Sequence, residues 1–402
     1  MQIGTQCAVI TYDEIALKGG NRRWFENTLR DNIARKLCTI DSAMRCERWW
    51  GRMIVHGVTE RTADAVRSVL RMTPGIVGYG LGVMIPREEE TKETEIIHHV
   101  VAASRGTWKT FRVTVKRVDK NFPGTSQELA RRYGAAVVAD RTARGESASV
   151  ALRGAEREIV VEILRSWVLV YIKERGVGGL PVGTSGHAVA LLSGGFDSPV
   201  AAWMIATRGV EISAIHFHGM PHTSEASVQK VRDLSQVLAQ YTGSVRLAIV
   251  PVVPAMKAIA LEGKQDALRV VLLRRFMNRV AEAYAETVGA RALVTGESVG
   301  QVASQTLENM TVTGAPVTMP LLRPLCGMSK QEIIARAQHI GTHDISVRPH
   351  DDTCSNFMPG SPVLRATAEE VEAALRTYDE DALVERALRE VTAQTYSYRL
   401  SY

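Results

Sequence analysis

The stretch VALLSGGFDSPVAAWM, residues 189–204, decides how the second half of the chain folds. An apolar run ends at Gly194 and Gly195, and an aspartate, a serine and a proline follow before a second apolar run. Glycine can adopt positive φ and leaves backbone N–H groups uncovered. Ser198 is predicted to be the N-cap of a helix, with Pro199 at its first position. The stretch therefore predicts a strand, an anion-binding loop and a helix whose positive dipole end faces the anion.

The sequence after this loop alternates between short apolar runs and amphipathic segments. Continuous apolar strands that are each followed by a helix indicate a parallel sheet covered on both faces. We therefore expect a doubly wound α/β domain with its ligand at the carboxyl ends of the strands, where the glycine loop lies. Strands are expected at 188–192, 211–217, 245–252, 291–296 and 317–322, with helices ending near 208, 241, 286 and 340 and a final acidic helix over 366–391.

The first half of the chain has a different pattern. Residues 8–86 read as strand, helix, strand, strand, helix, strand, which is typical of a small ferredoxin-like α+β domain. Residues 88–178 read as helix, strand, helix and a pair of strands. The glycine-rich segment 174–187 resists regular structure and is predicted to link this half to the α/β domain. Helices are expected at 22–37, 62–71, 91–103 and 126–140.

Positive charge is concentrated in this first half. The chain of 402 residues has a net charge of +6, and residues 1–180 contain 29 Lys and Arg against 21 Asp and Glu. The strand expected at 110–117 alternates apolar residues with Arg112, Thr114 and Lys116, so its basic side chains share one face. That face could hold RNA, and a solvated basic surface is the other explanation of the same charge.

Membrane attachment and metal or disulfide frameworks are not expected. No segment is both long and apolar enough to span a bilayer and no basic leader opens the chain, so we expect a cytoplasmic protein. The five cysteines include no C-x-x-C pair, which argues against disulfide frameworks and a zinc site. Any cysteine with a chemical role is expected to act as a thiol, and Cys326 is expected to be packed as a small hydrophobe.

The glycine loop itself narrows the choice of anion. It matches neither the G-x-x-x-x-G-K-[ST] pattern nor the G-x-G-x-x-G pattern of other phosphate-binding loops. Asp197 would repel a phosphate unless its carboxylate bound a cation, so Mg²⁺ is implied. The strand–SGGxDS–helix element resembles the PP-loop of ATP pyrophosphatases, which hold the β- and γ-phosphates of ATP while a nucleophile attacks the α-phosphate.

Longer stretches, in matching order as far as about Pro362, carry a wider resemblance. They include YDEIALKGGNRRWFENTL, FRVTVKRVDKNFPGTSQELARRYGAAVV, LVTGESVGQVASQTLENM and RPLCGMSKQEIIARAQHIGTHDIS. Together they resemble the tRNA 4-thiouridine synthetase family, ThiI. The resemblance implies a ferredoxin-like domain at 1–78, a THUMP RNA-binding domain at 79–178 and a PP-loop ATP pyrophosphatase domain with a helical tail at 179–402. It also implies that ATP adenylates the 4-oxygen of uridine 8 in tRNA and that persulfide sulfur then displaces AMP.

The glycine loop and the resemblance assign the site residues. Asp197 and Lys330 match an essential aspartate and lysine, and Cys354 matches a cysteine that takes part in sulfur transfer. On the sequence alone, a core histidine explains His216 as well as a ligand contact does, and a solvated lysine is the favoured explanation of Lys330. The residues expected to bind ATP are Leu191, Leu192, Ser193, Gly194, Gly195, Asp197, Ser198, His216, Phe217, Arg274, Gly296 and Gln305.

The expected partners follow from where the chain departs from the family. Many members carry a C-terminal rhodanese domain whose cysteine bears the persulfide, and this chain ends at Tyr402 without one. Sulfur is therefore expected to reach Cys354 directly from a cysteine desulfurase or another persulfide donor, and a role in thiamine synthesis is disfavoured. Thr353 stands where other members have a cysteine, which disfavours an iron–sulfur site. The resemblance also implies a homodimer.

Two other functions stay open on the sequence. The first is a different PP-loop enzyme that thiolates or amidates its substrate after adenylation, which would have no use for the basic first half. The second is an RNA-binding protein whose nucleotide domain is degenerate, and the intact glycine loop speaks against it. Release of pyrophosphate from ATP would separate this second function from the enzymatic ones.

Overall fold

The computed structural model describes residues 4–87, 93–263, 265–349, 353 and 357–399. They form two compact units that divide between Pro181 and Val182, inside the predicted linker. Each unit has a sheet and a hydrophobic core of its own. In these ranges every helix is too short or too polar to cross a bilayer.

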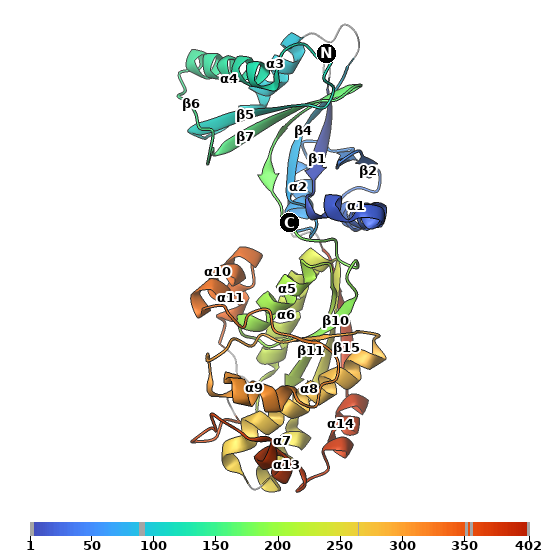
Figure 1. Ribbon diagram of the computed structural model, residues 1–402, viewed down its shortest axis with the longest axis vertical. Coiled ribbons are helices and arrows are strands. Elements are labelled where there is room, and N and C mark those ends of the chain that lie inside the picture. Colours follow the sequence, from blue (N-terminus) through green and yellow to red (C-terminus); the bar gives the residue numbers. More distant parts are fainter. Residues whose placement is uncertain (1–3, 88–92, 264, 350–352, 354–356, 400–402) are drawn as a thin grey trace. The chain divides into compact units, whose positions relative to one another are not determined.

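One sheet runs through the whole of the first unit (Figure 1). Its nine strands in the described ranges lie in the order β2-β3-β1-β4-β8-β7-β5-β6, and β9 pairs with β4. The expected domain boundary after residue 78 falls at the start of β4, which pairs with β1 on one side and β8 on the other. The strands are β1 (Thr5–Thr11), β2 (Arg45–Trp49), β3 (Arg52–His56), β4 (Gly78–Pro86), β5 (Thr110–Arg117), β6 (Ser149–Val150), β7 (Arg157–Ile163), β8 (Trp167–Ile172) and β9 (Glu174–Arg175).

Glycines along β4 let the two parts of this unit share the strand. A Cβ atom at Gly82 would lie 2.0 Å from the carbonyl oxygen of Val170, and one at Gly80 would lie 2.2 Å from that of Ile172. No side chain fits at such distances, which is why glycine occurs inside a strand where it otherwise weakens the ladder. The backbones of β4 and β8 can therefore approach closely.

Four helices cover this sheet in the described ranges. In Figure 1, α3 and α4 lie together over β5 and β7, and they close a core around Phe111 and Tyr133. The predicted helix at 22–37 matches the observed bounds, and the other three agree to within three residues. The helices are α1 (Arg22–Leu37), α2 (Ala63–Arg71), α3 (Glu93–Ala103) and α4 (Ser126–Ala143), with short 3₁₀ turns at Glu14–Leu17 and Gly19–Asn21.

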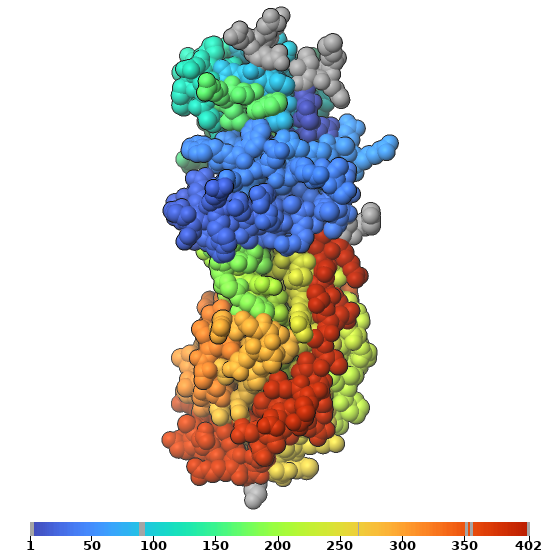
Figure 2. All heavy atoms as spheres, turned by 90° about the vertical axis from the view of Figure 1, so that its right-hand side faces the viewer, coloured from blue at the N-terminus to red at the C-terminus, as the bar shows by residue number. Residues whose placement is uncertain are grey.

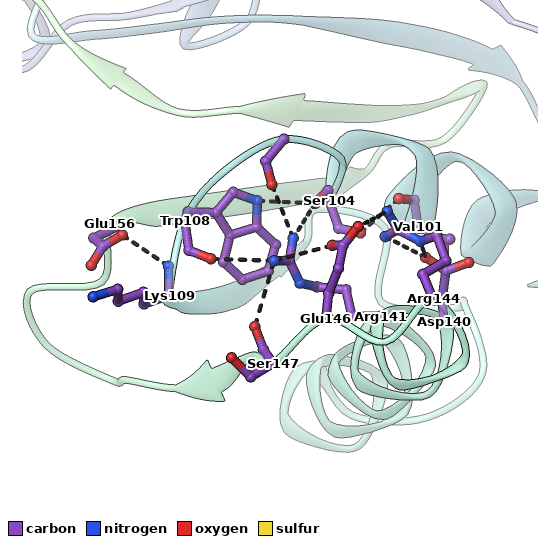
Figure 3. A network of polar contacts seen from close by, with 11 residues as sticks. Val101, Ser104, Trp108, Lys109, Asp140, Arg141, Arg144, Glu146, Ser147 and Glu156 are labelled. Carbon is purple, nitrogen blue, oxygen red and sulfur yellow. Dashed lines mark hydrogen bonds and ion pairs between the residues drawn. The ribbon is translucent and has the colours of Figure 1, made fainter.

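A buried arginine near the end of α4 organises the adjoining loops (Figure 3). Arg141 is 4% exposed, and its guanidinium donates to the carbonyl oxygens of Ser104, Gly106 and Trp108 at 3.1–3.3 Å. It also lies 3.9 Å from the centre of the Trp108 ring and pairs with Glu146 at 3.2 Å. The positive charge of Arg141 therefore stabilises the fold.

The basic side chains predicted on one face of β5 form ion pairs with the neighbouring strand. Arg112 pairs with Glu158 at 2.6 Å, and Lys116 pairs with Glu162 at 3.0 Å. Glu162 is only 1% exposed and also pairs with Arg52. Glu158 is likewise shared by Arg112 and Lys173, so the face keeps an excess of positive charge, but Arg112 and Lys116 are both held in ion pairs.

The second unit contains the doubly wound sheet. Its six strands in the described ranges lie in the order β14-β13-β10-β11-β12-β15, and the first five are parallel as predicted. The chain builds outward from β10 through β11 and β12 and then crosses to β13, so the strand order reverses between β10 and β13. The strands are β10 (His187–Leu191), β11 (Glu211–His218), β12 (Ser244–Pro251), β13 (Leu293–Val294), β14 (Leu321–Leu322) and β15 (Thr392–Ser397).

Helices cover both faces of this sheet, as a doubly wound fold requires. α5, α6, α10 and α11 contact one another on one side, and α8 contacts α7, α9 and α14 on the other (Figure 1). The helices are α5 (Asp197–Ala206), α6 (Glu225–Thr242), α7 (Val253–Leu261), α8 (Arg269–Thr287), α9 (Leu307–Gly314), α10 (Lys330–Ile340), α11 (His343–Ser346), α13 (Ala368–Leu375) and α14 (Glu380–Arg389), with 3₁₀ turns at Asp266–Leu268 and Ala303–Gln305.

The C-terminal segment differs from the single acidic helix predicted at 366–391. Two helices, α13 and α14, replace it, and the chain then forms β15, which pairs antiparallel with β12. Figure 2 shows this red segment along the outside of the unit. The strand TAQTYS is mostly exposed and polar, so it lacks the apolar alternation that would have predicted it.

Candidate active site

A cavity of about 180 Å³ lies at the carboxyl ends of β10, β11 and β13, where the strand order reverses. Parallel α/β sheets bind their ligands at such points. Ten of the twelve residues expected to bind ATP line it, and the other two, Gly194 and Gly195, lie in the adjoining loop. The remaining lining residues are Ile215, Met277, Asn278, Thr295, Glu297 and Thr353.

The SGGFDS loop is closed by two serines, and this corrects the predicted cap. α5 begins at Asp197 with Phe196 as its N-cap, and Ser198 lies inside the first turn. The Ser198 hydroxyl accepts a hydrogen bond from the Ser193 N–H at 2.8 Å and lies 3.1 Å from the Ser193 hydroxyl. Because this hydroxyl closes the loop, it does not cap the helix, and the N-cap prediction was wrong.

The two loop glycines also differ from the prediction. Neither Gly194 nor Gly195 is among the glycines with positive φ. The serine hydrogen bonds close the turn without left-handed backbone. A Cβ atom at Gly195 would meet nothing nearer than 3.7 Å, so the loop is open there.

Gly296 fixes the distance between this loop and the turn after β13. A Cβ atom at Gly296 would lie 2.7 Å from the backbone nitrogen of Ser198 and 2.8 Å from the carbonyl carbon of Asp197. Only glycine permits such an approach to the backbone. The turn therefore packs directly on the first residues of α5.

Asp197 and Lys330 meet at the mouth of the cavity. The Lys330 ammonium donates to both carboxylate oxygens of Asp197, at 2.8 and 3.0 Å, and the Gln301 amide donates to one of them at 2.9 Å. Lys330 is the first residue of α10, and its ammonium also lies 5.4 Å from the centre of the Phe196 ring. The pair is partly exposed, with 43% of the lysine and 21% of the aspartate side chain accessible. A ligand entering the cavity would therefore meet both charges.

A buried carboxylate orients Arg274 beside the cavity. Glu297 is 4% exposed and accepts from the Arg323 guanidinium at 2.7 Å and from the Thr295 hydroxyl at 3.0 Å. Its other oxygen lies 3.6 Å from Arg274, which donates to the Ser304 hydroxyl at 2.8 Å. The buried charge is thus compensated by two arginines, as such groups require.

His216 is both buried in the core and part of the cavity wall. It is 7% exposed, and its Nδ1 lies 2.9 Å from the carbonyl oxygen of Leu192. A carbonyl can only accept, so Nδ1 carries the proton. This bond joins the end of β11 to the end of β10.

Comparisons with known proteins agree with this architecture. The ThiI ferredoxin-like domain matches residues 7–80, the THUMP domain 90–173, and the family model described as thiamine biosynthesis protein (ThiI) 183–379. A probable tRNA sulfurtransferase of Caldanaerobacter subterraneus subsp. tengcongensis is 40% identical, over 95% of this chain and 98% of its own. The chain belongs to the ThiI family of tRNA sulfurtransferases.

Further relatives extend this assignment to the ThiI family. A probable tRNA sulfurtransferase of Thermus thermophilus is 40% identical over 98% of this chain and 95% of its own length. The crystal structure of a 4-thiouridine synthetase–RNA complex with bound ATP superposes with a TM-score of 0.84 at 34% identity, covering 98% of this chain and all of that one. The ferredoxin-like, THUMP and PP-loop fold classes expected from the sequence are confirmed.

The cysteines of this ThiI-family chain are separated in the fold. Cys354 lies outside the described residues, while Thr353 before it lines the cavity and donates to the Phe217 carbonyl at 3.2 Å. Burial raises the pKa of the Cys7 thiol to about 12, so it is protonated at neutral pH. Cys326 was predicted to be buried and is only partly so, because it sits in the open loop between β14 and α10.

Several residues of the site escaped the sequence reasoning. Gln301, Glu297 and Ser304 each contact a predicted site residue, Asp197 or Arg274, and Arg323 contacts Glu297. The signal in the sequence for the first three is proximity to Gly296, which they follow within one loop, and Arg323 has no such signal. In the described ranges, no three His, Cys, Asp or Glu side chains are grouped to hold a metal ion.

Proposed function

We propose that this chain is an ATP-dependent tRNA sulfurtransferase that converts uridine 8 of tRNA to 4-thiouridine and releases AMP and pyrophosphate. The observation that carries the proposal is the cavity at the reversal of strand order, which both Arg274 and the SGGFDS loop line and beside which Asp197 of that loop pairs with Lys330. Membership of the ThiI family supports the same reaction, and a solved relative binds RNA and ATP.

The triphosphate is assigned to the SGGFDS loop. This loop leads into the N-terminus of α5, where unpaired N–H groups and the helix dipole favour an anion. The nucleoside is assigned to the ends of β10 and β11, which Leu192 and His216 line. Arg274, held by Glu297 and Ser304, is oriented to contact a phosphate as a charge-assisted donor.

Adenylation comes first because a uracil oxygen is a poor leaving group. The 4-oxygen of uridine attacks the α-phosphorus of ATP, the bond to pyrophosphate breaks, and the oxygen becomes part of a good leaving group, AMP. Negative charge grows on the departing pyrophosphate in this step. Lys330 is placed to stabilise it when the ammonium turns from Asp197 toward the phosphates, a form of electrostatic catalysis.

We propose Mg²⁺ as the cation that accompanies ATP. Asp197 supplies one carboxylate, and phosphate oxygens with water would complete a coordination shell of the kind that Mg²⁺ has in nucleotide sites. Asp197 lines the cavity, and Gln301 donates to only one of its oxygens, so the other oxygen is free for such an ion once the Lys330 ammonium turns to the phosphates. When bound, Mg²⁺ would withdraw charge from the phosphates and favour departure of pyrophosphate.

Sulfur transfer is assigned to Cys354. A cysteine desulfurase or another persulfide donor would leave Cys354 as a persulfide, whose terminal sulfur attacks C4 of the uridine and displaces AMP. The product of that step is a disulfide between the base and Cys354. An external thiol then attacks the Cys354 sulfur, which releases 4-thiouridine and leaves a protein–thiol disulfide for a second thiol to reduce.

The reaction is tested by reconstitution. The full-length protein with tRNA, ATP, Mg²⁺, cysteine, a desulfurase and dithiothreitol should produce 4-thiouridine, detected by mass spectrometry of nucleosides. Absence of the product from active components would reject the proposal. Cys354→Ser should abolish 4-thiouridine while tRNA-dependent pyrophosphate release continues, and unchanged 4-thiouridine formation would remove this thiol from the mechanism.

We also propose a cellular location and an oligomeric state for the enzyme. Its substrates, tRNA and ATP, support a cytoplasmic location. The resemblance to the ThiI family supports a homodimer, which light scattering on the purified protein tests directly. A monomer that is fully active at nanomolar concentration would overturn the dimer.

A further inference from the structure

Several of the basic residues that the sequence offered for RNA are held in contacts within the first unit. Arg112 and Lys116 pair with carboxylates of β7, and Arg141 lies under backbone carbonyls. Arg132 pairs with Glu93 at 2.9 Å. A surface for RNA must therefore be sought where exposed positive charge remains.

A ridge of two tryptophans stands at the turn between β2 and β3. Trp50 is 83% exposed, and the turn that presents it passes through Gly51 at φ +72°. Trp49 beside it is half-buried and lies 6.4 Å from Trp167, centre to centre, at the start of β8. We call Trp49 and Trp50 the tryptophan ridge. An indole left this exposed contributes almost no burial to the fold.

An open hollow lies on each side of the tryptophan ridge, and both are lined by it. Their volumes are about 450 and 400 Å³. The first is lined also by Gly19, Gly20, Arg22, Arg23, Glu26, Arg48 and Gly51, and the second by Arg52, Val118, Leu164, Arg165, Ser166 and Trp167. Spaces of this size accept groups as large as a nucleobase.

Each hollow offers one exposed arginine that keeps its charge for a ligand. Arg22 and Arg48 share the carboxylate of Glu26, at 2.8 and 3.0 Å. In the described ranges, by contrast, neither Arg23 nor Arg165 forms an ion pair, and both are exposed. The ridge is therefore an aromatic surface flanked on both sides by positive charge.

We propose that the tryptophan ridge binds unpaired nucleotides of the RNA substrate. A base would stack on the Trp50 indole, and Arg23 and Arg165 would contact the phosphates on either side of it. Aromatic side chains that stack bases, together with basic groups that follow the backbone, characterise proteins that bind single strands. Bases inside a duplex are already stacked, so the ridge selects single-stranded segments. This inference rests on the proposed function only in taking RNA as the substrate.

The test measures binding by the full-length protein, without catalysis. Fluorescence anisotropy would compare a labelled single-stranded RNA octamer with a hairpin that has no unpaired ends. Trp50→Ala should weaken octamer binding by roughly 5- to 100-fold, the range for the loss of one base–aromatic stack, and Trp50→Phe should restore most of it. Trp24→Ala is the matched control, because Trp24 is 51% exposed and lines neither hollow.

The two arginines give a second readout. Arg23→Gln and Arg165→Gln should each reduce the slope of log Kd against log salt by about 0.7, the value for one phosphate contact to a single strand. Trp50→Ala should leave that slope unchanged. A structural defect would instead lower the melting temperature, which we expect to be unaffected at so exposed a side chain.

Three results would overturn the inference. The first is that Trp50→Ala binds the octamer with wild-type affinity, which is also the result expected if the ridge serves a protein partner. The second is that Trp24→Ala weakens octamer binding as much as Trp50→Ala does. The third is that Trp50→Ala weakens binding of the hairpin as much as binding of the octamer. The outcome is separable from the proposed function. If the wild-type protein forms no 4-thiouridine but binds the octamer through Trp50, the proposed reaction fails and the ridge stands. If Trp50→Ala binds normally and thiolates tRNA, only the ridge fails.

Discussion

Gly296→Ala tests whether close packing of two loops sets the geometry of the site. The added Cβ would lie 2.7 Å from the Ser198 nitrogen, against ordinary contacts that begin at 3.4 Å, so the backbones must separate by about 0.7 Å. Overpacking of this kind destabilises a protein by about 1–3 kcal/mol. For a unit of this size that corresponds to a melting temperature lower by roughly 2–12 °C.

The same displacement should reach the chemistry, because it moves the first turn of α5 and Asp197 with it. A misplacement near 1 Å can lower a rate by about 100-fold, so we expect adenylation to fall by roughly 10- to 100-fold. Calorimetric titration of ATP, tRNA-dependent pyrophosphate release and thermal unfolding measure the three effects. Gly327→Ala is the control, since its Cβ would meet nothing within 4 Å. Wild-type ATP affinity, rate and stability in Gly296→Ala would refute the reasoning.

Three further changes test other parts of the structure. Asp197→Asn should lower the rate of pyrophosphate release by roughly 100-fold, since it removes the charge proposed to hold the cation. It should change the free energy of unfolding by less than ~1 kcal/mol, because the ion pair with Lys330 is partly exposed. A normal rate of pyrophosphate release at low Mg²⁺ would contradict this. Glu297→Gln should destabilise the second unit by about 2 kcal/mol in urea unfolding, less than the ~3–5 kcal/mol of a fully buried pair, because both of its arginines are partly exposed. Burial lowers the pKa of Lys36 to about 7 from its usual value near 10.5. Between these two pH values the unfolded chain binds a proton that the folded chain does not. The free energy of unfolding should therefore rise with pH across this window. Lys36→Met should remove this rise and therefore raise the melting temperature more at pH 6.5 than at pH 9.5, and an equal gain at both would show that the amine does not titrate there.

The parts of the fold that sequence could predict are those determined by neighbours in the chain. The helix at 22–37 follows from its own apolar spacing, and the strand, loop and helix around SGGFDS follow from the order of residues within sixteen positions. The strands of the parallel sheet are buried on both faces, so they read as continuous apolar runs.

What the sequence could not show depends on residues far apart in the chain. β15 forms only because β12 offers it an edge, and its own composition is polar. Arg112 and Lys116 of β5 pair with Glu158 and Glu162, which lie more than forty positions away in the chain. The site behaves likewise, since Lys330 pairs in the structure with Asp197, which lies 133 residues earlier in the chain.

The strand shared by the two halves of the first unit also governs how that unit unfolds. β4 is hydrogen-bonded to β1 on one side and β8 on the other, so neither half can open without breaking a ladder of the other. Residues 4–181 should then exchange their slowest amide protons together, as one cooperative block. A protein severed after residue 78 would leave β1 with an unpaired edge prone to self-association. The ferredoxin-like and THUMP modules are distinguished by sequence comparison, but we expect them to unfold as a single cooperative unit.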